Sequence, residues 1–145
     1  MRIRKVIAAL SVTALASLGT VAAAPAAQAA QPGQTALTGG YGCSGSHVWS
    51  GDVGGAGTVH TYYDGSTNCS VFVKDTYAGV RTYTDIYVQK TGDSGWIDGG
   101  GGYYTTYAGP VSIYAPGACI REWVIENDPN GNNIVYGPTP WHSCS

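Results

Sequence analysis

One short motif has the residue types for nucleophilic chemistry. Gly92-Asp93-Ser94-Gly95 places a serine between glycines, and His60 and either Asp75 or Asp85 precede it in the chain. Serine hydrolases combine such a serine with an imidazole base and a carboxylate that orients it. A minimal serine hydrolase using Ser94 and His60 is therefore one interpretation of the sequence.

The surroundings of this motif argue against catalysis. The chymotrypsin-like fold, which uses such a serine loop, consists of two barrels and needs a considerably longer chain than this one. Trp96 also stands where that family has a glycine. Gly-Asp-Ser-Gly is equally the chemistry of a turn between two strands. We predict a turn here, and no catalytic residue anywhere in the chain.

The sequence predicts neither a metal ion nor a cofactor. Asp128, Asn130 and Asn132 resemble the start of a calcium loop, but Asn133 and Thr139 stand where that loop has Gly and Glu. A hairpin turn explains them better. The histidines are scattered along the chain: His47, His60 and His142. Most acidic residues flank glycines or polar turns, and nothing in the sequence sets two of them at the separation of a glycosidase pair.

Aromatic side chains are the remaining candidates for function. The chain has 11 Tyr and 4 Trp, many beside glycine-rich turns. Adjacent aromatics in a strand point to opposite faces, so one of each pair should face solvent. Exposed Tyr and Trp rings can stack on sugars or anchor a protein partner, although tyrosine is also simply a favourable strand residue. The candidate ligand-binding aromatics are Tyr62, Trp96, Tyr103, Tyr104 and Tyr107.

The elements that must position these residues are short strands. Residues 80–90 alternate, with Val80, Thr82, Thr84, Ile86 and Val88 on one face. The 22 glycines of the chain break it into short extended segments. Asn130-Gly131 is a strong hairpin signal. About six or seven strands at close spacing, with no helical periodicity, predict an all-β fold: a small antiparallel β-sandwich or barrel.

The first residues have the features of a secretory signal peptide. A basic head precedes an uncharged Ala- and Leu-rich run and a small-residue exit at Ala27-Gln28-Ala29. This predicts a signal peptide at 1–29, a flexible segment at 30–40 and an all-β domain at 41–145. The rival interpretation is a membrane anchor, but the run holds several polar residues and no stop-transfer cluster follows it. After cleavage we expect a secreted monomer without a membrane anchor.

Composition narrows the choice of partner. Charged residues make up 11% of the chain, and three of the seven basic residues lie in the predicted leader. The remainder is acidic, which argues against a nucleic-acid partner because binding the phosphate backbone needs a basic patch.

An even number of cysteines in an exported chain indicates disulfides. The four cysteines allow three pairings, and the loop lengths favour a sequential one, which would stabilise the fold by about 3–4 kcal/mol per bridge. No C-x-x-C spacing points to zinc. The four cysteines that we expect to form disulfides are Cys43, Cys69, Cys119 and Cys144.

Two stretches carry a resemblance to a known family. The segment Tyr107-Ala-Gly-Pro-Val-Ser-Ile-Tyr-Ala-Pro-Gly-Ala-Cys119-Ile resembles the spore-associated protein A family of secreted actinomycete proteins. The segment from Gly57 through Asn68-Cys69-Ser-Val is similar to a strand pair of the same family. The resemblance implies a small exported protein found with spores or aerial growth, and it brings no catalytic residues.

These observations lead to one expectation and one alternative. We expect a secreted, non-catalytic protein that is associated with the cell or spore surface. The alternative is a secreted binding module or hydrolase inhibitor that uses exposed aromatics. The expected partner is a cell-wall or spore-surface polymer, or an extracellular protein.

Overall fold

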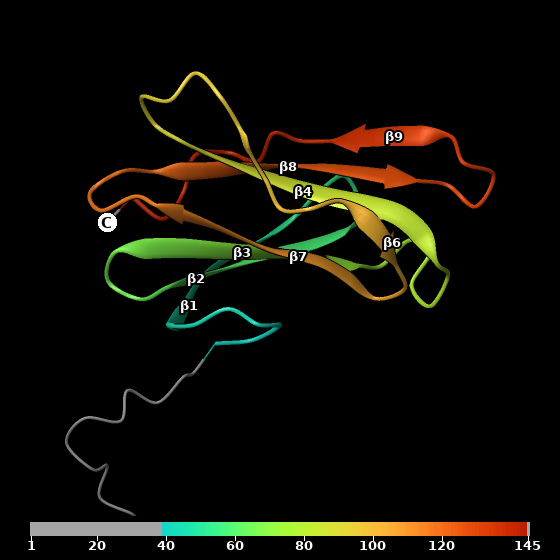
Figure 1. Ribbon diagram of the computed structural model, residues 1–145, viewed down its shortest axis with the longest axis horizontal. Helices are drawn as coiled ribbons and strands as arrows, with labels where there is room; N and C mark the ends of the chain where they lie inside the picture. The colour runs from blue at the N-terminus through green and yellow to red at the C-terminus, as the bar shows by residue number, and fades with distance from the viewer. Residues whose placement is uncertain (1–38, 145) are drawn as a thin grey trace, which may run out of the picture. The chain divides into compact units, whose positions relative to one another are not determined.

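The computed structural model describes residues 39–144 of the chain (Figure 1). The predicted signal peptide, and residues 30–38 of the predicted flexible segment, lie outside the described residues. The described range holds no helix with the length and apolarity to span a bilayer. In chain order its strands are β1 (Ser46–Asp52), β2 (Gly57–Tyr63), β3 (Thr67–Lys74), β4 (Thr82–Lys90), β5 (Ile97–Asp98), β6 (Gly102–Tyr104), β7 (Tyr107–Tyr114), β8 (Ile120–Asn127) and β9 (Asn133–Tyr136).

The strands form two antiparallel sheets that pack face to face. The first sheet has the order β1-β2-β3-β7, and the second has the order β5-β4-β8-β9, with β6 also paired to β4. Figure 1 shows β4, β8 and β9 in one layer and β3 and β7 in the other. The prediction of an all-β fold is confirmed, and of its two forms the sandwich is the one adopted.

The core lies between the sheets and follows the predicted alternation. On β4, Thr82, Thr84, Ile86 and Val88 all point inward and are buried. Val80, expected on the same face, precedes the strand and is exposed. The larger apolar cluster combines both sheets: Val53, Ala56, Val59, Phe72, Ile86, Val88, Val111, Ile113, Ala115, Ile120 and Val124. Removing these side chains from water is the main force that holds the layers together.

Two tight turns are set by aspartates, as the sequence indicated. The carboxylate of Asp64 accepts hydrogen bonds from the backbone N–H groups of Thr67 (2.8 Å) and Ser66 (3.0 Å). The carboxylate of Asp128 accepts one from the Asn132 side chain (2.7 Å) and one from its backbone N–H (2.9 Å). Hydrogen bonds to the charged form lower the pKa of both aspartates, chiefly from Thr67 and the Asn132 side chain respectively. Both carboxylates are therefore used in turns.

Two disulfides join the cysteines sequentially, Cys43 to Cys69 and Cys119 to Cys144. The first fastens the segment before β1 onto the outer face of the first sheet. There Cys43 and Cys69 pack with Tyr62 and Val71 as a second, smaller cluster. This covering segment decides which residues of that face reach solvent.

The inward face of β8 carries two buried glutamates. Glu126 forms an ion pair with Lys74 (3.1 Å), and both side chains are fully buried. Lys74 also donates to the Thr82 hydroxyl (2.6 Å) and to backbone carbonyls of Val80 and Tyr104. Because the ammonium has partners on several segments, the pair is a structural junction between the sheets.

Candidate binding site

The residues of the hypothetical serine hydrolase are not brought together. Ser94 lies in the exposed turn after β4, where the Gln89 amide donates to the Asp93 carbonyl (2.9 Å). His60 lies on β2 in the other sheet, and its ring contacts Ser50, His47 and Tyr41. Its neighbours on β2, Val59 and Thr61, point into the core, so His60 faces outward, away from the second sheet. The geometry offers no serine–imidazole pair at Ser94.

The buried imidazole of His142 has a structural role. Its Nε2 lies 2.7 Å from a carboxylate oxygen of Glu122, which is completely buried. Glu122 also accepts hydrogen bonds from the hydroxyls of Ser70 (2.6 Å), Thr139 (2.9 Å) and Thr61 (3.1 Å). These partners satisfy the buried carboxylate, as burial of a charge requires.

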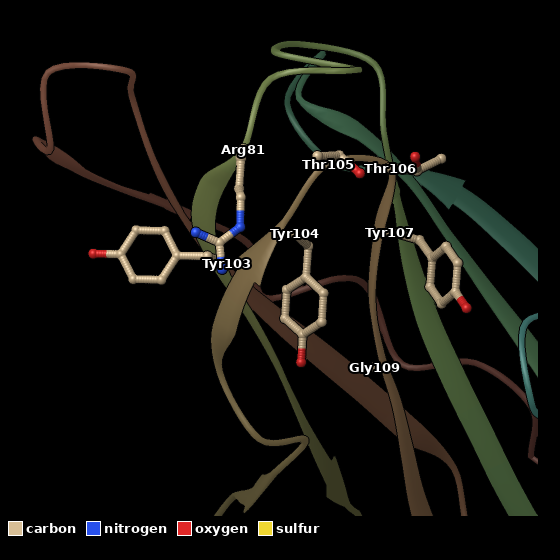
Figure 2. A pocket seen from close by; sticks show the side chains of 7 residues that line it. All are labelled: Arg81, Tyr103, Tyr104, Thr105, Thr106, Tyr107 and Gly109. Carbon is tan, nitrogen blue, oxygen red and sulfur yellow. The ribbon is translucent and has the colours of Figure 1, made fainter.

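Three of the candidate aromatics gather in one pocket. Tyr103, Tyr104 and Tyr107 line a cavity of about 350 Å³, here called the tyrosine pocket. Its other lining residues are Arg81, Thr105, Thr106 and Gly109. Figure 2 shows the Tyr104 and Tyr107 rings extending the same way from the two sides of the Thr105–Thr106 turn, whereas Tyr103 extends to the other side.

The rings of the tyrosine pocket differ in how firmly they are held. Tyr104 donates its hydroxyl hydrogen to the Gly100 carbonyl (2.9 Å), which fixes its ring. Tyr103 is 61% exposed and has the Arg81 guanidinium over its face at 5.2 Å. Tyr107 is 37% exposed and lies against Tyr41, with ring centroids 5.1 Å apart. The pocket is thus lined by tyrosines of which only one is pinned by a hydrogen bond.

The fourth candidate, Trp96, belongs to a different surface on the second sheet. Together with Tyr87, Trp123 and Ile125 it lines a cavity of about 250 Å³, here called the tryptophan groove. The Trp96 and Trp123 rings are 5.6 Å apart and nearly perpendicular, at 89°. Two indoles at right angles form two walls of the groove.

An arginine supports the tryptophan groove. The Arg121 guanidinium lies 5.2 Å from the centre of Trp96 and 4.4 Å from that of Trp141. The Arg121 Nε–H donates to the Gln89 side-chain oxygen (2.9 Å). Cation–π contacts and this hydrogen bond together hold a charged donor beside the indoles.

Tyr87, another lining residue of the tryptophan groove, interacts with the carboxylate of Asp85. A hydrogen bond from Tyr87 to Asp85 raises the pKa of the Tyr87 hydroxyl, because it stabilises the protonated phenol. Burial raises the pKa of Asp85, and the nearby Asp98 adds to that effect. Asp85 and Tyr87 are two positions apart on β4, so their side chains lie side by side on the same face of the sheet.

The glycine run between β5 and β6 packs closely over β4. A Cβ atom at Gly99 would lie 2.7 Å from the Ile86 carbonyl oxygen, which is too close for any side chain. Gly99 instead donates its N–H to that carbonyl (2.9 Å). The sequence predicted a break at these glycines, and the structure adds that the missing side chains let the segment approach β4.

Tyr62, expected from the sequence to be a candidate ligand-binding aromatic, is buried and does not face solvent. Only 7% of it is exposed, because it packs beneath the disulfide-fastened segment with Cys43 and against His47. Sequence reasoning missed Tyr41, Arg121, Trp123 and Trp141. No local pattern marked them, because they join the sites through contacts between distant segments.

Metal ligands are sparse in the described part of the chain. Between residues 39 and 144, no three side chains of the types His, Cys, Asp or Glu gather where they could hold a metal ion. The loop at Asp128, whose sequence resembled the start of a calcium site, uses the Asp128 carboxylate for its own turn.

Comparison with known proteins gives one relative. The chain is 41% identical over 73 residues to Spore-associated protein A of Streptomyces coelicolor. The match covers 49% of this chain and 46% of the relative, so the chain spans about half the length of the curated protein that it matches. The relationship to the spore-associated protein A family expected from the sequence is thus confirmed over that stretch. No family model matches the chain. No solved structure matches it either.

Proposed function

We propose that this protein is a secreted, non-catalytic protein of the cell or spore surface, and that it binds a carbohydrate polymer there through the tryptophan groove. The observation that carries the proposal is the pair of perpendicular indoles, Trp96 and Trp123, with Arg121 held beside them. This geometry supports both the choice of a carbohydrate polymer and the choice of the groove.

The groove has the chemistry that sugar rings require. The C–H face of a sugar packs on an indole, while its hydroxyls need hydrogen-bonding groups at the rim. Trp96 and Trp123 provide two half-buried rings, and Arg121 provides N–H donors. Trp141, which is 42% exposed and has the Arg121 guanidinium over its ring at 4.4 Å, extends the aromatic surface.

The groove is already ordered before a ligand arrives. Gln89 fixes Arg121 through a hydrogen bond of 2.9 Å, and Asp85 fixes the Tyr87 hydroxyl. Side chains that are held in place lose little conformational entropy on binding. This distinguishes the tryptophan groove from the tyrosine pocket, in which Tyr103 is largely exposed.

Location at the surface has separate support. Two disulfides suit an oxidising compartment outside the cytoplasm. The relative is called spore-associated, and the predicted leader agrees with export. Fractionation of sporulating cultures tests this part. Protein found with the spore or cell-wall fraction supports it, and protein found only in the medium of vegetative cells overturns it.

Sedimentation with insoluble chitin, cellulose and purified peptidoglycan tests the binding part. We expect the wild type to sediment with at least one polymer. Trp96→Ala should weaken that binding by roughly tenfold or more, as for a central aromatic contact. Tyr107→Ala, which truncates a ring of the tyrosine pocket, is the matched control and should bind normally.

Three results would overturn the assignment of the groove. They are the absence of binding to every polymer, loss of binding in Tyr107→Ala alone, and inhibition of an extracellular hydrolase that depends on Trp96. The last would identify a hydrolase inhibitor instead. Circular dichroism on both variants establishes that each is folded.

A further inference from the structure

Two histidines meet on the outer face of the first sheet, away from the tryptophan groove. His47 Nε2 lies 3.4 Å from His60 Nδ1. The Ser50 hydroxyl oxygen lies 2.7 Å from the first nitrogen and 2.8 Å from the second. His47 and Ser50 are exposed and His60 is half-buried, so the cluster is open to solvent.

An irregularity in β1 creates this cluster. Ser50 is directly opposite His60, and His47 is opposite Tyr62, but the register shifts between His47 and Trp49. In a regular strand, residues 47 and 49 would share a face, and Trp49 packs against the core. The extra residue of a bulge reverses the alternation and turns His47 outward, onto the face that carries Ser50 and His60. Bulges often re-aim side chains at functional sites.

The spacing of the two nitrogens matches that of a chelated metal ion. Zinc binds imidazole nitrogens at about 2.0–2.1 Å, and two such nitrogens at a tetrahedral angle are about 3.3–3.4 Å apart. The observed separation is 3.4 Å. The two nitrogens belong to different strands, and the cross-strand pairing of β1 with β2 keeps them at this distance.

We propose that His47 and His60 form a two-histidine binding site for a divalent transition-metal ion of the zinc, nickel and copper class. Imidazole is a preferred ligand for these metals, whereas calcium and magnesium favour oxygen ligands. The ion replaces the Ser50 hydroxyl between the two rings. Each ring must then carry its proton on its other nitrogen.

The remaining coordination positions face solvent. A structural zinc site has four protein ligands, and this one has two imidazoles with Ser50 as a neighbouring hydroxyl. Water fills the open positions, so the ion is exchangeable and accessible to an external ligand. Tyr41 packs on the outer side of His60, with ring centroids 6.0 Å apart, and Tyr62 packs edge-on against His47 at 5.3 Å. These rings restrict the orientation of both imidazoles.

Calorimetric titration of the full chain with zinc chloride, on protein without a histidine tag, tests the proposal. We expect one bound Zn²⁺ per chain. His47→Ala and His60→Ala should each weaken binding by roughly tenfold or more. Ser50→Ala is the control, since it removes the hydroxyl between the rings but retains both imidazoles, and it should bind zinc at least as well as the wild type.

Histidine resonances in NMR spectra locate the ion. Zinc should shift the ring signals of His47 and His60 and leave those of the buried His142 unchanged. Unaltered affinity in either histidine variant, a shift at His142 alone, or no change in any ring at millimolar zinc would overturn the proposal. The result is independent of polymer binding, because the two surfaces lie on different sheets.

Discussion

The indole of Trp49 stacks face to face on the imidazole of His142, with ring centroids 3.6 Å apart and planes within 6° of parallel. Trp49 lies on β1. His142 lies near the C-terminal end of the chain and forms an antiparallel bridge with Ile120 at the start of β8. The same imidazole is bonded to Glu122. One buried ring thus links the first strand, the central strand β8 and the C-terminal segment.

His142→Ala should destabilise the protein by about 3 kcal/mol, because it leaves the buried Glu122 carboxylate without its imidazole partner. It also removes the stacking surface of Trp49. His47→Ala, at an exposed position, should change the free energy of unfolding by no more than about 0.5 kcal/mol. Urea denaturation with the disulfides intact measures both. Equal midpoints for the two variants would contradict a structural role for His142.

Lys74→Met should destabilise the protein far more at pH 7 than at pH 4. Burial raises the pKa of Glu126 above 4.5, and the Lys74 ammonium opposes that rise. Without Lys74 the pKa rises further, so the folded state holds a proton that the unfolded chain releases as the pH passes 4.5. Stability is therefore lost as the pH increases above that value. Denaturation curves across this range measure the effect, and a pH-independent loss would contradict it. Lys74→Met/Glu126→Leu, which removes both charges, is the control.

The pKa of His60 should lie below 6.5 and rise in His47→Gln without reaching that value. Burial is the larger cause of the lowered pKa, and the neighbouring His47 is the smaller one, so removing His47 restores only part of the shift. Below pH 6.5 the unfolded chain binds the proton first, and His60 then makes folding less favourable. NMR titration of the His60 ring measures the pKa. The same pKa in both proteins would show that the two rings do not interact.

Gly99→Ala, just after β5, should destabilise the protein by about 1–3 kcal/mol, whereas Gly95→Ala, in the turn before β5, should not. A Cβ at Gly99 meets the Ile86 carbonyl oxygen at 2.7 Å, and a Cβ at Gly95 meets nothing within 4 Å. Thermal unfolding of the two variants compares them directly. Trp96 fluorescence should also change in Gly99→Ala if the loop positions the groove. Equal melting temperatures would exclude close packing as the reason for glycine at 99.

A strand and a hairpin of the fold could be predicted from patterns of neighbouring residues in the sequence. The alternation around Ile86 predicted a half-buried strand, because side chains of a strand alternate between two faces. Asn130-Gly131 predicted a hairpin, and Asp128 indeed closes it through its carboxylate. These signals work because turn chemistry and strand periodicity depend on residues that are neighbours in the chain.

The candidate sites were only partly predictable. Trp96 and Tyr103 were equally good candidates, yet Trp96 lies in the tryptophan groove and Tyr103 in the tyrosine pocket. Trp123 was not singled out, because one ring in an alternating strand looks like any other. A binding surface combines strands that are distant in the sequence and adjacent in space. The order of strands in a sheet cannot be predicted from any short segment of the sequence.

An all-β, disulfide-linked fold could be predicted from the amino-acid sequence, because alternation of period two is a local pattern and the composition and the even number of cysteines are totals over the chain. The burial of Tyr62 and the contact between His47 and His60 could not, because they depend on how separate segments pair. The first depends on the Cys43–Cys69 bridge, which fastens a distant segment over the ring. The second depends on a bulge that reverses the facing of a strand. Both outcomes follow from pairing between separate segments, where a shift of one residue moves a side chain to the opposite face.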